Sequence, residues 1–255
     1  MTGWLKHPLR VTGRLLWMTG ELLLCALMYL SHCAFRSGPA ATLLRASWLS
    51  YTARRLLRIF CAEVEVTGSV PERGLLVSNH LSYVDVVVLG SLAPSVFVAK
   101  REVKNWPVFG WFARLGGTVF VHREKRVQSR EAADAIETAL NRGVLVILFP
   151  ESTSSNGETV LPFKSALLEP VTQQTHPLFI SMIRYELDDG DPGEEVCYWK
   201  DMTLLPHLVN LFSKRNVRAF VRFARVRAGE TDRKQLARQL HSEVVKLQAA
   251  TKSAA

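Results

Sequence analysis

The pattern of apolar and polar positions changes near residue 60. Residues 15–35 form an almost unbroken apolar run, long enough for a bilayer-crossing helix of roughly 20 residues. Residues 40–60 repeat apolar positions at helical spacing with arginines between them. That pattern is typical of an amphipathic helix among lipid headgroups, or of an ordinary surface helix. We therefore expect residues 1–60 to be membrane-associated helices.

The charges around the apolar run leave its topology open. Glu21 and His32 lie inside the run, and basic residues flank both of its ends. A charge at the centre of the hydrocarbon costs about 2.5–3.5 kcal/mol, and flanking charges of one sign give no crossing direction. A full span and a hairpin that dips into one leaflet both remain possible. A cleaved signal peptide fits less well, because the run is too long and lacks a small-residue cleavage site.

After residue 61, short β-rich runs alternate with helical stretches. This alternation predicts an α/β fold with a mixed, largely parallel sheet covered by helices, in one domain spanning residues 61–255. The run at 144–149 is apolar on both faces, as expected for a central buried strand. The predicted strands are 63–66, 74–78, 96–99, 118–121, 144–149, 178–183 and 217–223. The predicted helices are 84–92, 108–115, 127–141, 164–172, 204–211 and 233–248, and 188–195 is expected to be an acidic loop.

Composition narrows the classes of partner. Lys and Arg outnumber Asp and Glu by 32 to 23, a formal charge of +9, which suits an anionic membrane or an anionic substrate. Zinc-finger and RNA-binding patterns are missing, so no nucleic acid is expected as a partner. The four cysteines form no C-x-x-C pair, which indicates free thiols in a reducing compartment. The scattered histidines predict no metal site.

His80 and Asp85 are the first candidate chemistry. On one continuous helix, a spacing of five would put their side chains about 140° apart. If His80 ends the strand and Asp85 begins the next helix, the chain turns between them and the carboxylate can reach the imidazole. Such a carboxylate fixes the ring tautomer, and the other nitrogen can take a proton from a hydroxyl. The alternative is an unrelated histidine and a helix-capping aspartate.

Four sequence blocks, in order, resemble the PlsC-type glycerolipid acyltransferases. N-H-L-S-Y-V-D at residues 79–85 is similar to the first block of that family, N-H-x-S-x-x-D. Residues 97–123 resemble the second block, and F-P-E-S-T-S-S-N-G at 149–157 resembles the third, F-P-E-G-T-R-S. His-Pro-Leu at 176–178 stands in the place of the fourth. The resemblance covers roughly residues 60–225.

The resemblance implies an O-acyltransferase that moves a fatty acyl chain from acyl-CoA or acyl-carrier protein directly to a lysolipid hydroxyl, without a further cofactor. His80 matches the general base of the family, and Asp85 matches the carboxylate that orients it. The implied partners are membrane lipids and the thioester donor, at the cytoplasmic face of a membrane, the inner membrane in a bacterium. The positions that match substrate-binding residues of the family are Lys100, Gly117, Phe120, Arg123, Glu151, Ser152 and Thr153.

The third block departs from the family pattern at two positions. Ser152 replaces a glycine, which would permit close backbone approach and a positive φ. Ser154 replaces an arginine, and with it a planar phosphate-binding fork is lost. Arg123 and nearby lysines could compensate for that loss.

The acceptor expected first is 1-acylglycerol-3-phosphate (lysophosphatidic acid), in phospholipid biosynthesis. The alternative is a lyso-ornithine-type aminolipid or a head-grouped lysophospholipid, because residues 156–168 are similar to those branches. A non-catalytic membrane-binding protein and a lipid hydrolase are alternatives from other classes. The intact His80–Asp85 pair argues against the first of these, and the missing G-x-S-x-G elbow argues against the second.

Overall fold

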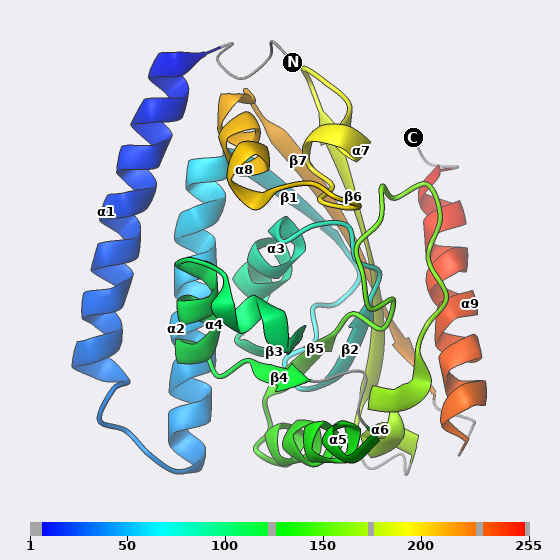
Figure 1. Ribbon diagram of the computed structural model, residues 1–255. Helices are drawn as coiled ribbons and strands as arrows, with labels where there is room; N and C mark the ends of the chain where they lie inside the picture. The colour runs from blue at the N-terminus through cyan, green and yellow to red at the C-terminus, as the bar shows by residue number, and fades with distance from the viewer. Residues whose placement is uncertain (1–6, 122–125, 173–175, 228–231, 253–255) are drawn as a thin grey trace.

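A seven-stranded sheet forms the centre of the molecule, with helices on both of its faces (Figure 1). The computed structural model of the chain describes residues 7–121, 126–172, 176–227 and 232–252. The strand order is β1-β7-β6-β2-β5-β3-β4. The strands are β1 Ala62–Thr67, β2 Gly74–Ser78, β3 Ser95–Lys100, β4 Val119–Val121, β5 Leu145–Leu148, β6 Leu178–Leu187 and β7 Val217–Val226.

The sheet is mixed and largely parallel, as predicted. In the described residues, β6 and β7 pair antiparallel and the remaining strand pairs are parallel. Every residue of β2 and β5 is buried, which fits their central positions. β6 continues well past the end of β2, because its last pair with that strand is Ser78 with Ser181. Because β2, β5, β3 and β4 run parallel, their carboxyl ends lie at the same edge of the sheet. β6 extends beyond that edge.

Helices cover the two faces as the alternation predicted. α2 (Pro39–Phe60), α3 (Val84–Leu92) and α8 (Leu204–Ser213) pack their apolar side chains against one face. α5 (Arg126–Asn141) and α9 (Arg233–Lys252) cover the other. Alternate residues of the central strands β2 and β5 face the two cores, as the pleat requires.

Two local predictions were wrong. The expected helix 164–172 is interrupted: the 3-10 helix η2 (Ser165–Leu167) precedes a separate one-turn helix, α6 (Glu169–Thr172). Pro170 explains the break, because proline lacks the N–H that would continue a helix and its ring clashes with the preceding turn. The expected acidic loop contains α7 (Pro192–Glu195), whose first turn is capped by Asp191 Oδ1 accepting from Gly193 N at 2.7 Å.

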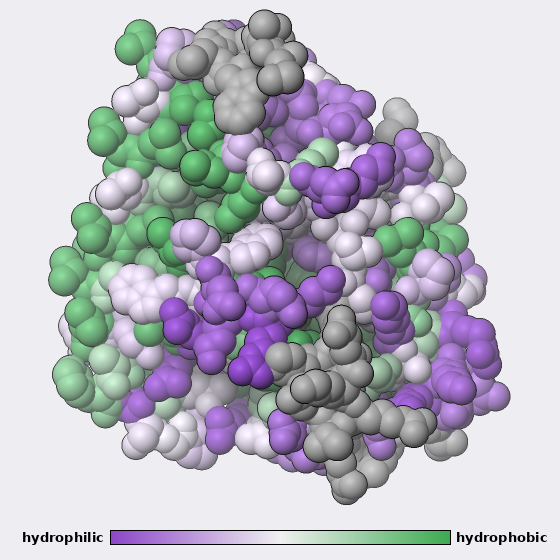
Figure 2. Space-filling view, in the orientation of Figure 1, coloured by the Kyte–Doolittle hydropathy of each residue, from purple (hydrophilic) through white to green (hydrophobic). Residues whose placement is uncertain are grey.

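α1 (Pro8–His32) lies along α2 and presents an apolar outer surface (Figures 1 and 2). By length and composition it is the one helix of the described residues that could cross a membrane. Polar contacts tie its inner side to the protein. Glu21 forms an ion pair with Arg55 of α2, and Arg14 Nη1 donates to Phe212 O at 3.0 Å. The exposed apolar residues of α1 and the following turn include Leu9, Leu16, Trp17, Leu23, Leu27, Leu30 and Phe35.

α2 is part of the folded core. Ile59 and Phe60 are fully buried against the sheet. Arg54 Nε donates to Ser91 O of α3 at 2.8 Å, and Arg55 pairs with Glu21. Of the two interpretations of residues 40–60, the structure therefore supports a helix packed on the domain, and two of its arginines bind protein groups.

Candidate active site

The first signature block lies at the edge where the parallel strands end. β2 stops at Ser78, His80 follows it, and Asp85 lies in the first turn of α3. Ligands of open α/β sheets bind beyond the carboxyl ends of the strands. Lys100, the last residue of β3, lies at the same edge of the sheet.

The predicted contact between His80 and Asp85 is present. His80 Nδ1 lies 2.8 Å from Asp85 Oδ2, and the same oxygen accepts from Leu81 N at 2.7 Å and Ser82 N at 3.0 Å. Because an ionised carboxylate can only accept, Nδ1 carries the shared proton and Nε2 presents its lone pair. Asp85 is completely buried, while 23% of the His80 side chain is exposed. A buried carboxylate therefore holds an imidazole that is partly open to solvent.

The third block holds the His80 ring and main chain. The imidazole stacks on Phe149 at a centroid distance of 4.2 Å and an interplanar angle of 20°. His80 N donates to Glu151 Oε1 at 2.9 Å, and His80 O accepts from Ser155 N at 3.0 Å. Phe149 therefore supports the imidazole ring, while Glu151 and Ser155 hold the main chain of His80.

Glu151 uses both carboxylate oxygens on main-chain donors. Its Oε2 accepts from Leu161 N at 3.1 Å, while Oε1 accepts from His80 N. Burial raises the pKa of Glu151 to about 7, although these two hydrogen bonds act in the opposite direction. We therefore expect Glu151 to act by positioning the loops around His80, and not by direct contact with substrate.

The other predicted substrate residues lie in the turn before β4, in β4 itself and in the segment after β5. Ser152 has φ 69°, so this serine adopts the left-handed conformation for which the family uses glycine. Gly117 also has a positive φ, of 80°, and a Cβ there would meet nothing within 4 Å. Phe120 lies in β4 and is half-buried, and Thr153 is exposed. Arg123 lies outside the described residues, and the substrate-binding roles stay predictions.

An apolar cavity of about 120 Å³ lies beside the turn that connects His80 to Asp85. Tyr83, between His80 and Asp85, lines it, and its hydroxyl bonds to His207 Nδ1 at 3.0 Å. The remaining walls come from α1, α2, α3, α4 (Phe109–Leu115) and the 3-10 helix η1 (Arg101–Asn105). The lining is almost entirely aliphatic and aromatic, so it suits a hydrocarbon chain.

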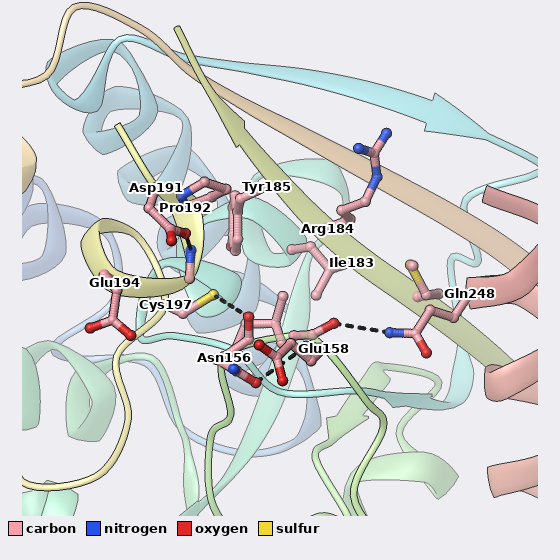
Figure 3. A pocket seen from close by; sticks show the side chains of 14 residues that line it. Asn156, Glu158, Ile183, Arg184, Tyr185, Asp191, Pro192, Glu194, Cys197 and Gln248 are labelled. Carbon is pink, nitrogen blue, oxygen red and sulfur yellow. Dashed lines mark hydrogen bonds between the residues drawn. The ribbon is translucent and has the colours of Figure 1, made fainter. Parts of the chain in front are cut away.

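A second cavity, of about 340 Å³ and with both polar and apolar lining residues, lies between α7, β6 and the end of α9 (Figure 3). Its lining includes Leu81 and Tyr185 but neither His80 nor Asp85. Gln248 Nε2 donates to Gly157 O at 3.0 Å across it. Among the residues that the structure describes, no three His, Cys, Asp or Glu side chains are grouped as metal ligands would be.

Sequence analysis missed Tyr185. Its hydroxyl donates to Asp85 Oδ1 at 2.7 Å, and the two residues are 100 positions apart in the chain. No local pattern signals this contact, because it depends on how far β6 extends beyond β2.

Comparison with known proteins fits this geometry. Residues 63–183 match the acyltransferase family model. The lyso-ornithine lipid O-acyltransferase of Brucella abortus is 35% identical, over 75% of this chain and 78% of that protein. The enzyme of the same name from Pseudomonas aeruginosa is 32% identical, over 81% of this chain and 80% of its own length. The 1-acyl-sn-glycerol-3-phosphate acyltransferase of Neisseria gonorrhoeae is 33% identical, over 55% of this chain and 60% of that protein.

A solved structure shares the fold. The 1-acyl-sn-glycerophosphate acyltransferase PlsC from Thermotoga maritima superimposes with a TM-score of 0.66 at 22% identity, covering 96% of this chain and 98% of that one. Together with the ordered signature blocks, these similarities identify the enzyme class. The chain belongs to the PlsC-type acyltransferase family, and it is an acyltransferase that acts on lysolipids.

Proposed function

We propose that this enzyme transfers a fatty acyl chain from a thioester to the free hydroxyl of a lyso-ornithine-type aminolipid, with His80 as the general base. The braced imidazole carries the catalytic part of this proposal. Its Nδ1 is held by Asp85 at 2.8 Å, and 23% of the side chain is exposed.

The chemistry needs no protein nucleophile. His80 Nε2 takes the proton of the acceptor hydroxyl as that oxygen attacks the thioester carbonyl. The tetrahedral intermediate then expels the thiolate, which receives the proton from the imidazolium, and the new ester is released. The Asp85 carboxylate stabilises the imidazolium between these two steps.

The acceptor assignment rests on two observations. Two relatives that match about three quarters or more of this chain are named as lyso-ornithine lipid enzymes. Ser154 stands where the family has an arginine, and its hydroxyl donates to Tyr198 O. This position therefore has no guanidinium group that could bind a phosphate with two hydrogen bonds. Lysophosphatidic acid, the acceptor expected first from the sequence, is the competing outcome.

The donor is an acyl-CoA or an acyl-carrier-protein thioester in this proposal. The apolar cavity beside Tyr83 supports a fatty chain as the transferred group, since its walls carry few polar atoms.

A panel of acceptors tests the assignment. The purified full chain is supplied with acyl-CoA or acyl-carrier protein, and with lyso-ornithine lipid, lysophosphatidic acid or lysophosphatidylethanolamine. We expect kcat/KM for lyso-ornithine lipid to exceed that for lysophosphatidic acid by about tenfold or more, a difference of about 1.4 kcal/mol. Preference for lysophosphatidic acid would overturn the acceptor assignment. Free fatty acid without acylated lipid would indicate hydrolysis, and no thiol release with any donor would contradict catalysis.

We further propose that α1 attaches the enzyme to one leaflet, at the cytoplasmic face of the membrane. Arg14 near the start of α1 bonds to main-chain oxygens of Phe212 and Lys214, and Trp48 Nε1 bonds to Cys25 O further along α1. Since α1 lies against the domain at both places, a membrane-spanning α1 would place part of the domain surface in the hydrocarbon. The exposed leucines of α1 support insertion of its outer side alone.

Replacing Glu21 by glutamine is expected to weaken this attachment of α1 to the domain. Arg55 would lose its ionic partner in a site where the Glu21 and Arg55 side chains are only 12% and 23% exposed. We expect the free energy of unfolding in detergent to fall by about 1.5–2 kcal/mol, the lower part of the usual range for hydrogen bonds to charged groups. The control is Glu137→Gln, at an exposed glutamate of α5, which should leave stability unchanged. Equal stability of the Glu21 variant and the control would contradict the anchoring role.

A further inference from the structure

We infer that Tyr185 is a positioning residue for Asp85, and through Asp85 for the His80 ring. The inference rests on the proposed role of His80 and adds a third member to the pair. Tyr185 comes from β6, outside the four signature blocks, and its hydroxyl lies 2.7 Å from Asp85 Oδ1.

The two oxygens of Asp85 have very different surroundings. Oδ2 accepts three hydrogen bonds, from His80 Nδ1, Leu81 N and Ser82 N. Oδ1 accepts from Tyr185, and the described residues supply no other donor to it. Without that hydroxyl, a fully buried anionic oxygen would have no partner, which is costly in a low-dielectric site. The carboxylate would then turn to share its existing donors between both oxygens, and its bond to His80 Nδ1 would weaken.

The Tyr185 hydroxyl is suited to a permanent donor role. Burial, followed by the charge of Asp85, raises the pKa of Tyr185 well above its ordinary value. The phenol therefore stays protonated throughout the working pH range. Among the described residues its hydrogen-bond partner is Asp85 Oδ1, which can accept but not donate when the carboxylate is ionised.

Asn79 of the first signature block explains how the Tyr185 hydroxyl comes to lie beside Asp85. The β2–β6 ladder ends at Ser78 and Ser181. Beyond it, Asn79 Nδ2 donates to Ile183 O at 3.0 Å and Asn79 Oδ1 accepts from Ile183 N at 2.8 Å, so this side chain extends the ladder. Strand side chains alternate between faces, which places Tyr185 on the same side as Ile183. Figure 3 shows Arg184 pointing to the opposite side of β6.

The test is Tyr185→Phe, which removes one oxygen and keeps the ring. We expect kcat to fall about tenfold, while KM for donor and acceptor stays within about twofold because Tyr185 is placed behind Asp85. Tyr51→Phe is the matched control. This variant also deletes a phenolic oxygen. The oxygen of Tyr51 lies on the remote α2, where it accepts a hydrogen bond from Arg55 Nη1 at 2.8 Å, so its loss should leave kcat unchanged.

A double-mutant cycle separates positioning from general structural support. In an Asp85→Ala background, Tyr185→Phe should change the remaining rate by less than about twofold, because its partner is already absent. As a readout independent of turnover, the low-field proton resonance of His80 Nδ1–H should shift in Tyr185→Phe and not in Tyr51→Phe.

Two results would overturn the inference: wild-type kcat with an unshifted proton resonance, or the same tenfold loss in both backgrounds. Either result would leave the role of His80 intact if His80→Ala is inactive. Loss of the proposed function itself would appear differently, as a wild-type enzyme that transfers no acyl group.

Discussion

Replacing His80 by alanine is expected to lower kcat by about 10²–10⁴-fold, the range over which a positioned general base contributes. The variant keeps Asp85 and the apolar cavity but has no group to take the acceptor proton. KM for the acyl donor should change little, since the imidazole acts mainly in the transition state. Initial rates of thiol release at saturating donor and acceptor measure the effect.

The fold should survive this substitution. His80 is tied to Glu151 and Ser155 through its main-chain N–H and C=O, which alanine retains. The control is His32→Ala, at an exposed histidine at the end of α1, which should have wild-type kcat. A His80→Ala variant that melts like wild type and keeps more than about a tenth of its kcat would contradict the base assignment, given the magnitude above.

Replacing Glu151 by glutamine is expected to remove a large pH dependence of stability. The pKa of this carboxyl is 4.5 in the absence of the fold and about 7 in it. The folded chain therefore holds the proton more tightly, and this contribution is complete below pH 4.5 and lost as pH rises through 7. A difference of this size is equivalent to about 3 kcal/mol. Glutamine cannot ionise, so the variant lacks this loss.

Urea unfolding of both proteins between pH 4 and 8 measures this effect. The free energy of unfolding of wild type, minus that of the variant, should fall by about 3 kcal/mol across the range. All other titrating groups are common to both proteins and cancel. If the two stability curves run parallel, the Glu151 carboxyl is not held in the buried, main-chain-bonded setting described above.

Local patterns in the sequence were sufficient for most of the fold. All seven predicted strands are present, and α3 begins and ends where it was expected, at Val84 and Leu92. The contact between His80 and Asp85 was also predictable, because a strand end followed at once by a helix confines both residues to one turn. Burial alternates along strands and helices with fixed periods, and the sequence displays those periods directly.

Features that depend on distant segments were not predictable. An apolar stripe on a helix has the same period whether it meets lipid or a sheet, so the buried position of α2 could not be distinguished beforehand. The bond from Tyr185 to Asp85 depends on the overhang of β6, and the extension of its ladder by Asn79 spans 104 positions. The hydrogen bonds from two main-chain N–H groups to the Glu151 carboxylate could not be predicted either, and its substrate role stays a prediction.

Thiol release in the absence of acceptor tests the central claim most directly. The enzyme is mixed rapidly with acyl-CoA, first alone and then with lyso-ornithine lipid, and free thiol is followed from the first turnover. Direct attack by the lipid hydroxyl, assisted by His80, predicts no release above background until acceptor is added, and then equal amounts of thiol and acylated lipid. A burst of one thiol per enzyme without acceptor, with the acyl group bound to the protein, would contradict it.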